Sequence, residues 1–441
     1  MAGIGRGGRI GPVTPRRAAA SVFSVLSTSA TRNRTNGECL TTPPCHDQSP
    51  PGTATCHHGD VRRLAIAVPV VLALTMLGAC GGGAPKVVST TKPRVTTSAP
   101  PSVPTSTSAP TTSAVPQDFQ AHSVTFVSAR LGWVLGTSGC SLCAPVLLRT
   151  EDAGRTWTRI PAPSDGYANE VRFADPQNGW IFGTNSGEAA TGLWATHDGG
   201  SHWNRPPLPG ITPGDIVSDV EAAAGMVSAT FNGGPIEIAT SPVQRDDWTA
   251  SGFTMPIGAG PVPSEQIVLQ SKVGWLIQVD RVVMGGARLD NGGWAAWSPP
   301  CSQAGGPAVL AASDSSHLVA VCDEGVYSST GAAPVVRAYF SNDGGSTFQP
   351  APTLPPKFSP NVTGMAMPAP GVVIMNSGSD LVGTFDGGTT WTVVNHPSAS
   401  VSWLQVGFTT PSQGVAIEGS GTLLMTFDGG HNWAPVNFSP P

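Results

Sequence analysis

Five aspartates recur in one short phrase, and their carboxylates are the side chains with the clearest spacing for chemistry. Each copy has the form Ser/Thr-x-Asp-x-Gly-x-x-aromatic. A ring of carboxylates could bind calcium or act in acid–base catalysis. Turn formation explains the spacing better, because aspartate accepts hydrogen bonds from nearby backbone N–H groups and glycine takes positive φ without steric cost. We therefore interpret these residues as structural: Asp152, Gly154, Trp157, Asp198, Gly200, Trp203, Asp343, Gly345, Phe348, Asp386, Gly388, Trp391, Asp428, Gly430 and Trp433.

The sequence lacks the common motifs of nucleophilic, metal and phosphate chemistry. It contains no Gly-x-Ser-x-Gly, no His-Glu-x-x-His and no phosphate-binding glycine-rich loop. The histidines after residue 117 are scattered, and His197, His202 and His431 lie inside the repeated phrase, where a solvent-facing turn position accounts for them. We predict no catalytic residue, no metal site and no cofactor.

The phrase also marks a sequence repeat. Two degenerate copies continue the series, so that the closing aromatics recur every 42 to 51 residues, at Trp157, Trp203, Trp248, Trp297, Phe348, Trp391 and Trp433. Short apolar runs precede several copies and contain Gly132-Trp133, Gly179-Trp180, Gly274-Trp275 or Gly414-Val415. Gly, Ser, Asn or Pro bound these runs, which is typical of strands.

Repeats of this length with about four short strands each predict an all-β fold, a β-propeller, because one small twisted sheet must stack on its neighbours to bury both faces. Seven markers favour seven four-stranded blades. Six or eight blades stay open, because the third and fourth markers are degenerate. We expect the two ends of the repeat region to meet in one blade, so that no sheet edge is left open.

The phrase resembles the Asp-box, or BNR repeat, of bacterial sialidases, sortilin-type receptors, some endoglucanases and the photosystem II assembly factor family. A Gly-Trp strand combined with Thr-x-Asp-Gly-Gly-x-x-Trp is most similar to the last family. The resemblance covers nearly all of residues 118–441 and implies a propeller that helps another envelope protein to mature. It says little about a site, because the motif belongs to the scaffold.

The alternative function is a carbohydrate-binding or sialidase-like glycoside hydrolase. A sialidase pattern has three arginines, a Tyr–Glu pair and an Arg-Ile-Pro stretch ahead of the first box. Here Arg159-Ile160-Pro161 follows the first box, and the only tyrosines are Tyr167, Tyr327 and Tyr339. The sequence cannot show whether two carboxylates lie at the separation that glycosidases need.

The segment before the propeller predicts export and anchoring. Residues 61–80 combine two arginines, a short apolar run and Leu77-Gly78-Ala79-Cys80, which resembles a lipoprotein signal ending at a lipidated Cys80. Residues 81–117 are rich in Pro, Ser and Thr and form a flexible tether. We expect the protein on the outer face of the bacterial cytoplasmic membrane.

Residues 1–60 precede this signal and do not fit it. We interpret them as a disordered extension or as the product of a misassigned start, with translation beginning near Val61. Arg16-Arg17 raises the alternative of a twin-arginine signal, but no apolar core follows closely.

Four cysteines remain after residue 80, and an even count in an exported chain favours disulfides. We expect Cys301 to pair with Cys322. Cys140 and Cys143 could close a small loop of their own, and a redox or zinc role would need a setting that the sequence does not show.

Charge and loop composition bear on the partner. Residues 118–441 carry 12 Lys and Arg against 25 Asp and Glu, a net charge of −13. Such a surface disfavours nucleic acid and other polyanions. We predict a monomeric, non-catalytic scaffold that binds an envelope protein or a cell-surface glycan. Residues 253–266 and 327–340 are the most irregular segments. They are either insertions that the fold tolerates, which is the favoured interpretation, or candidate binding loops.

Overall fold

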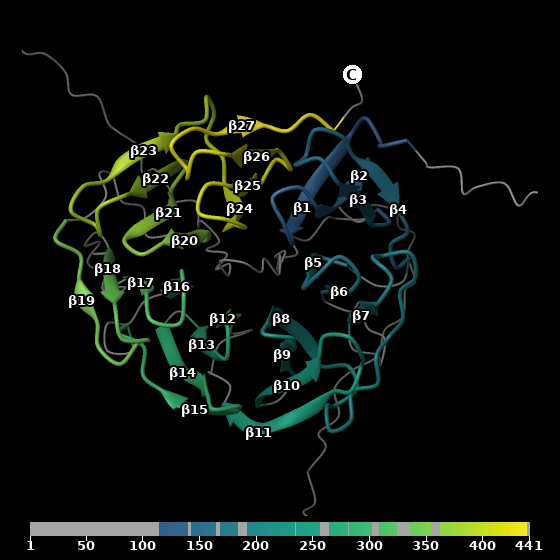
Figure 1. Ribbon diagram of the computed structural model, residues 1–441, viewed down its shortest axis with the longest axis horizontal. Coiled ribbons are helices and arrows are strands. Elements are labelled where there is room, and N and C mark those ends of the chain that lie inside the picture. The colour runs from purple at the N-terminus through teal and green to yellow at the C-terminus, as the bar shows by residue number, and fades with distance from the viewer. Residues whose placement is uncertain are drawn as a thin grey trace, which may run out of the picture. The chain divides into compact units, whose positions relative to one another are not determined.

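The structure is a computed structural model that describes residues 114–139, 143–164, 168–183, 192–233, 235–255, 264–280, 282–301, 308–323, 336–353 and 362–438. The strands form seven small sheets, which we call blades 1 to 7 in chain order, arranged as a ring (Figure 1). This confirms the predicted seven-bladed all-β propeller. The described residues include no helix with the length and hydrophobicity that crossing a membrane requires.

Blades 1 to 4 take up the first part of the ring. Blade 1 contains β1 (Phe119–Phe126), β2 (Gly132–Ser138), β3 (Val146–Thr150) and β4 (Thr158–Ile160). Blade 2 contains β5 (Glu170–Phe173), β6 (Gly179–Phe182) and β7 (Leu193–Thr196). Blade 3 contains β8 (Ile216–Ala223), β9 (Met226–Asn232), β10 (Ile236–Pro242) and β11 (Thr249–Met255). Blade 4 contains β12 (Ser264–Gln270), β13 (Val273–Asp280), β14 (Val282–Asp290) and β15 (Gly293–Trp297).

Blades 5 to 7 complete it. Blade 5 contains β16 (Ala308–Ala312), β17 (Leu318–Asp323), β18 (Val336–Ser341) and β19 (Gln349–Pro350). Blade 6 contains β20 (Met365–Ala369), β21 (Val372–Ser377), β22 (Asp380–Thr384) and β23 (Thr392–Asn395). Blade 7 contains β24 (Trp403–Phe408), β25 (Gly414–Glu418), β26 (Leu423–Thr426) and β27 (Ala434–Pro435).

Within each blade, consecutive strands pair antiparallel, and the first strand lies innermost (Figure 1). Blade 2 departs slightly from this plan. Its sheet has three strands, and a single bridge between Ala195 and Asn204 stands in the place of the fourth. Because neighbouring strands alternate in direction, the first and third strands of every blade end at the same end of the ring. We call this the turn end, because the repeated turns follow the third strands.

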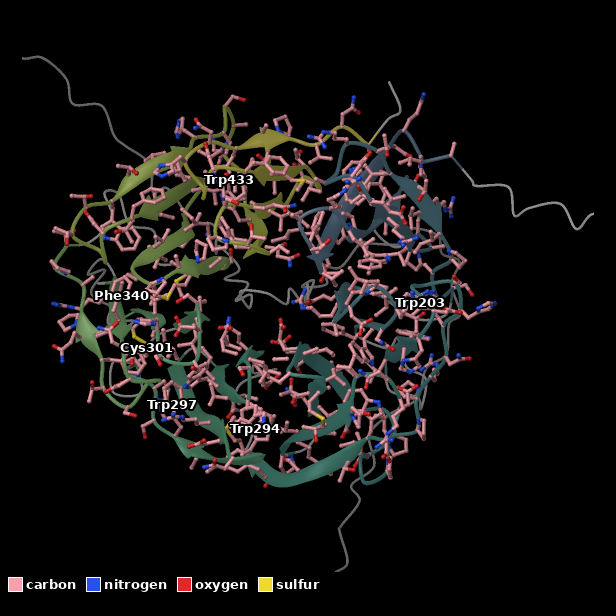
Figure 2. The ribbon with its side chains drawn as sticks, in the orientation of Figure 1. Trp203, Trp294, Trp297, Cys301, Phe340 and Trp433 are labelled. Atoms are coloured by element: carbon pink, nitrogen blue, oxygen red, sulfur yellow. A yellow bond between two sulfur atoms is a disulfide. The ribbon has the colours of Figure 1, made fainter. Side chains whose placement is uncertain are left out.

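The core consists of seven apolar clusters, one between each pair of neighbouring blades. Trp133 of β2 shows the packing: it is fully buried, and its ring stacks on Phe173 of β5 at a centroid distance of 3.7 Å. Figure 2 labels one aromatic side chain from each of five clusters, and these are Trp203, Trp294, Trp297, Phe340 and Trp433. The apolar burial predicted from the repeat therefore lies between the blades.

The glycine of the Gly-Trp pair has a steric cause. Gly132 of β2 lies directly opposite Phe126 of β1, and a Cβ on Gly132 would lie 2.5 Å from the phenyl ring. The same cross-strand pairing occurs between Gly179 and Phe173, where the distance is also 2.5 Å. The aromatic ring thus covers the glycine of the neighbouring strand, and a larger residue would require the ring or the strand pairing to shift.

The expectation that the two ends of the repeat share one blade is wrong. β1–β4 come entirely from the first repeat, and β24–β27 come entirely from the last. The first repeat already begins with its innermost strand and the last ends with its outermost, so no strand is left to be shared. Blades 7 and 1 meet as two separate sheets.

Polar and aromatic contacts close the ring at this junction. Gln405 of β24 accepts a hydrogen bond from Val124 N (2.9 Å) and donates one to Val124 O (3.0 Å). Phe438, which follows the last strand, packs its ring 4.9 Å from that of Phe119 and 5.4 Å from that of Trp157. Side-chain contacts and a backbone hydrogen bond from Ala121 N to Gly421 O (3.0 Å), rather than a shared sheet, therefore hold the first and last blades together.

A disulfide joins Cys301, which follows blade 4, to Cys322 in β17 of blade 5, with the two Cα atoms 5.3 Å apart. Both side chains are buried (Figure 2 labels Cys301). Cys143 is also disulfide-bonded. Cys140 and the whole segment 1–113, including Cys80, lie outside the described residues.

Candidate functional site

The repeated turns are closed hydrogen-bond units. In blade 7, Thr426 Oγ1 donates to Asp428 Oδ1 at 2.9 Å and accepts from Gly430 N at 3.0 Å. Asp428 Oδ1 also accepts from Asn432 N (2.9 Å), and its Oδ2 accepts from Asn432 Nδ2 (2.7 Å). The other four turns repeat this pattern, and the side chains that contact the second carboxylate oxygen are Thr156, His202, Thr347 and Thr390.

These contacts hold the aspartates in the ionised state. The hydrogen bond from the Thr156 side chain is the main cause that lowers the pKa of Asp152 to about 2. The Thr347 side chain likewise lowers the pKa of Asp343 to about 2. Each of these turns lies on a separate blade, after a third strand, so the structure does not bring the five aspartates together. They are turn residues, as the spacing indicates.

A second recurring device links the innermost strands. Ser123 Oγ in β1 accepts a hydrogen bond from Val171 N in β5 at 3.2 Å. Asp219 in β8 accepts one from Ile267 N in β12 at 2.8 Å, across the same separation of 48 residues. Two further junctions use a glutamine that both accepts from and donates to the facing backbone, and these are Gln266 with Leu310 and Gln405 with Val124. Polar side chains near the axis therefore provide hydrogen-bond partners for backbone groups at the exposed edges of the inner strands.

Blades 2 to 4 place a group of charged side chains beside the axis. Arg172 in β5 lies 3.0 Å from Glu221 in β8 and 4.0 Å from Glu170. Asp219 in β8 and Glu265 in β12 are buried next to them. Burial raises the pKa of Glu265 to about 7. Burial also raises the pKa of Glu221 to about 7, although Arg172 opposes the shift.

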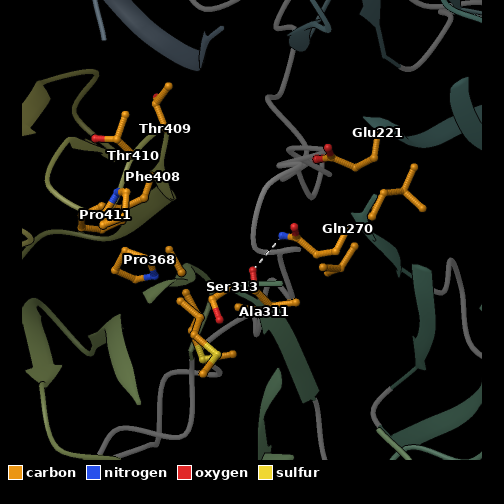
Figure 3. A pocket seen from close by; sticks show the side chains of 15 residues that line it. Glu221, Gln270, Ala311, Ser313, Pro368, Phe408, Thr409, Thr410 and Pro411 are labelled. Atoms are coloured by element: carbon orange, nitrogen blue, oxygen red, sulfur yellow. Dashed lines mark hydrogen bonds between the residues drawn. The ribbon is translucent and has the colours of Figure 1, made fainter. Parts of the chain in front are cut away.

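The innermost strands of five blades line a pocket of about 370 Å³. Its walls come from Glu221 in β8 and from the turn-end portions of β12, β16, β20 and β24 together with the residues that follow them. Figure 3 shows Glu221 and Gln270 on one side of the pocket and Thr409, Thr410 and Pro411 across from them. The pocket therefore lies on the propeller axis, at the end of the ring where the repeated turns lie.

The lining combines one carboxylate with neutral polar and apolar groups. Glu221 is the only ionisable side chain among the lining residues that the structure describes, and it is 16% exposed. Gln270 Nε2 donates to Ala312 O at 2.9 Å, which fixes its amide in the wall. Pro368 and Phe408 supply apolar surface. Such a lining suits binding of a ligand with an apolar part and a polar or cationic end.

The residues singled out in the sequence do not line this pocket. None of the five repeated turns contributes to it, and the two irregular segments leave described strands at the opposite end of the ring, after β11 and after β17. Residues 256–263 and 324–335 lie outside the described residues. Glu221 was missed because a single acid in an alternating strand is typical of a solvent-facing position. Glu221 occupies the position in its repeat that Arg172 occupies in the preceding repeat. This pairing of opposite charges at equivalent positions was the signal that could have found it.

Among the described residues, no group of three His, Cys, Asp or Glu side chains is arranged to hold a metal ion. The buried acids of blades 2 to 4 instead face Arg172 and one another.

Comparisons with known proteins show the fold. No family model matches the sequence, and no curated protein matches it. YCF48 from Cyanidioschyzon merolae is similar in structure, with a TM-score of 0.50 and 15% identity over 71% of this chain and 97% of that one. A YCF48 bound to a D1 peptide has a TM-score of 0.49 and 20% identity, over 71% of this chain and 93% of that one. An ancestral GH74 enzyme has a TM-score of 0.53 and 11% identity; the match covers 75% of this chain and about half (48%) of the enzyme.

Proposed function

We propose that the protein is an exported lipoprotein whose propeller is a non-catalytic scaffold that binds another envelope protein. The observation that carries the proposal is the axial pocket, because five blades contribute to one concave site of a size typical of ligand pockets, roughly 300–1,000 Å³. The repeated turns, by contrast, satisfy their own polar groups and leave no reactive carboxylate.

The lining favours binding over hydrolysis. A glycosidase of the usual kind needs two carboxylates that flank the scissile bond, roughly 5–10 Å apart. In the described lining Glu221 is the only carboxylate, and Arg172 already contacts it at 3.0 Å. The remaining lining groups are amides, hydroxyls, backbone and apolar side chains, which can recognise an extended ligand without reacting with it.

The lipid anchor is the second part of the proposal. It rests on the apolar run and small residues before Cys80 and on the Pro/Ser/Thr-rich stretch that separates Cys80 from β1. Replacing the cysteine by serine, Cys80→Ser, should move the protein from the membrane fraction to the soluble fraction and abolish incorporation of a labelled fatty acid. The anchor is refuted if Cys80→Ser remains in the membrane fraction or still carries the label.

The scaffold role is tested by chemical cross-linking of the full chain in its native envelope, followed by mass spectrometry of what stays bound under stringent washing. We expect one enriched envelope protein. Retention of cell-wall sugar without any protein partner would contradict the proposal and favour the carbohydrate-active alternative.

A further inference from the structure

The composition of the axial pocket restricts what it can hold. Glu221 presents a carboxylate from the wall formed by β8, and it is partly exposed. Pro368 and Phe408 lie across the pocket and supply apolar surface (Figure 3). One anionic group facing apolar side chains matches a ligand with an aliphatic stem and a cationic head. Lysine and arginine side chains have this composition.

The side chains around Glu221 add to the negative charge that a cationic ligand would meet. Arg172 and Glu170 face it from β5, Asp219 lies two residues away on its own strand, and Glu265 faces the group from β12. Three carboxylates, those of Glu170, Asp219 and Glu221, thus share one guanidinium, and Glu265 adds a fourth carboxyl beside Asp219, so full ionisation leaves an excess of negative charge beside the pocket. A cation in the pocket would offset this excess, whereas an anion would be repelled.

We propose that the axial pocket binds a lysine or arginine side chain of an extended segment of the partner protein, with the Glu221 carboxylate as the anionic contact and Pro368 and Phe408 against the aliphatic stem. This inference rests on the proposed scaffold function and specifies the chemistry of its site. Arg172 donates a hydrogen bond to Glu221 Oε1 at 3.0 Å and is not among the described residues that line the pocket.

The charge state of Glu221 gives the site a pH dependence. Because burial raises the pKa of this carboxyl to about 7, it is mostly ionised at about pH 8 and mostly neutral at about pH 5.5. A cation binds the ionised form. Its affinity should therefore fall severalfold as the pH is lowered between these values, because the ionised fraction of Glu221 falls.

The test is a titration of the full chain, labelled with ¹³C at the methionine methyl groups, followed by NMR. The probes are the capped peptides Gly-Ser-Lys-Ser-Gly and Gly-Ser-Arg-Ser-Gly and two matched peptides with norleucine or glutamate at the centre. Met365 and Met367 belong to the pocket wall and report on binding, whereas Met255 lies at the end of the outermost strand of blade 3, outside the pocket lining, and serves as an internal control. We expect the lysine and arginine peptides to shift the resonances of the pocket methionines with dissociation constants at least tenfold lower than those of the norleucine and glutamate peptides.

Two comparisons make the result specific. Glu221→Gln should reduce the affinity of the lysine peptide at about pH 8 at least tenfold and remove its pH dependence. Glu151→Gln removes the same charge from an exposed residue of blade 1 outside the pocket and should change neither. If Glu221→Gln fails to fold, the pH titration of the unmodified chain decides the matter.

Equal binding of the lysine and norleucine peptides, a pH-independent affinity, or no shift at any peptide concentration would overturn the inference. These failures are separable from failure of the scaffold role, because cross-linking to an envelope protein would still succeed if the partner occupied the pocket through neutral side chains.

Discussion

At the scale of single residues, the turn aspartates act by saturating local donors. Asp428 accepts from Thr426, from Asn432 N and from Asn432 Nδ2, and these bonds lower its pKa to about 2, with the Asn432 side chain as the main cause. Asp428→Ala should therefore lower the free energy of unfolding by about 1 kcal/mol, measured by urea denaturation. Asp247→Ala, at an exposed aspartate in a surface ion pair with Arg245, should change it by less than about 0.5 kcal/mol. Equal effects would show that the turn bonds add nothing.

The buried carboxylates affect the pH dependence of stability in the opposite direction to the turn aspartates. The pKa of Glu265 is raised to about 7 by burial, so the folded protein holds a proton that the unfolded chain releases near pH 4.5. Its contribution to stability is therefore greatest at low pH and declines as pH rises from about 4.5 to about 7. Glu265→Gln should flatten this decline in a series of urea denaturations between pH 5 and pH 8 and should stabilise the protein at pH 8. A variant with an unchanged slope would contradict the assignment.

The spacing of Asp, Gly and aromatic residues was enough to predict the turns, because their hydrogen bonds are local. The polar residues of the inner strands were not predictable in the same way. Asp219, Gln266 and Gln405 bond to backbone on a neighbouring blade, and a single strand carries no information about that neighbour. Glu221 was missed for the same reason.

At the scale of elements, the innermost two strands of a blade depend on a glycine covered by an aromatic ring. Gly132→Ala would place Cβ 2.5 Å from the ring of Phe126, and relief requires a shift of that ring or of the β1–β2 pairing. We expect a loss of about 1–3 kcal/mol in the free energy of unfolding. Gly293→Ala in β15 meets no atom within 4 Å and should change stability by less than about 1 kcal/mol. Similar losses for both variants in urea denaturation would refute the steric account.

The repeat was enough to predict the strands and the number of blades. Each of the seven closing aromatic residues marks one blade, even where the repeated phrase is degenerate. Blade 4 explains one altered spacing: Asn291 and Gly292 both have positive φ and connect β14 to β15 as a two-residue hairpin. That turn replaces the longer repeated turn.

At the scale of the whole molecule, the ring closes without a shared blade. Gln405 joins blades 7 and 1 with the same pair of hydrogen bonds that Gln266 makes between blades 4 and 5. The chain and the Cys301–Cys322 disulfide also connect blades 4 and 5, whereas only side-chain and backbone contacts join blades 7 and 1. The sequence could not reveal how blades 7 and 1 meet. The repeat pattern is the same whether the two ends of the chain share one blade or form two separate blades.

These two glutamines form a matched pair for an experiment. Gln405→Leu should open the seam locally, so that amide hydrogen exchange in β1 and β24 accelerates at least tenfold while the other blades keep their protection. Gln266→Leu should leave exchange in β12 and β16 much less affected, because the chain and the disulfide retain that junction. Equal acceleration at both junctions would argue against a weaker seam between blades 7 and 1.

Binding of a protein partner in the axial pocket can be tested by placing a photo-cross-linking amino acid at Thr409, which lines the pocket, and comparing it with the same amino acid at Thr392 on the outermost strand of blade 6. We expect irradiation in the native envelope to give a defined protein adduct from position 409 and none of that mass from position 392. The absence of an adduct from position 409, or the same adduct from both positions, would contradict it.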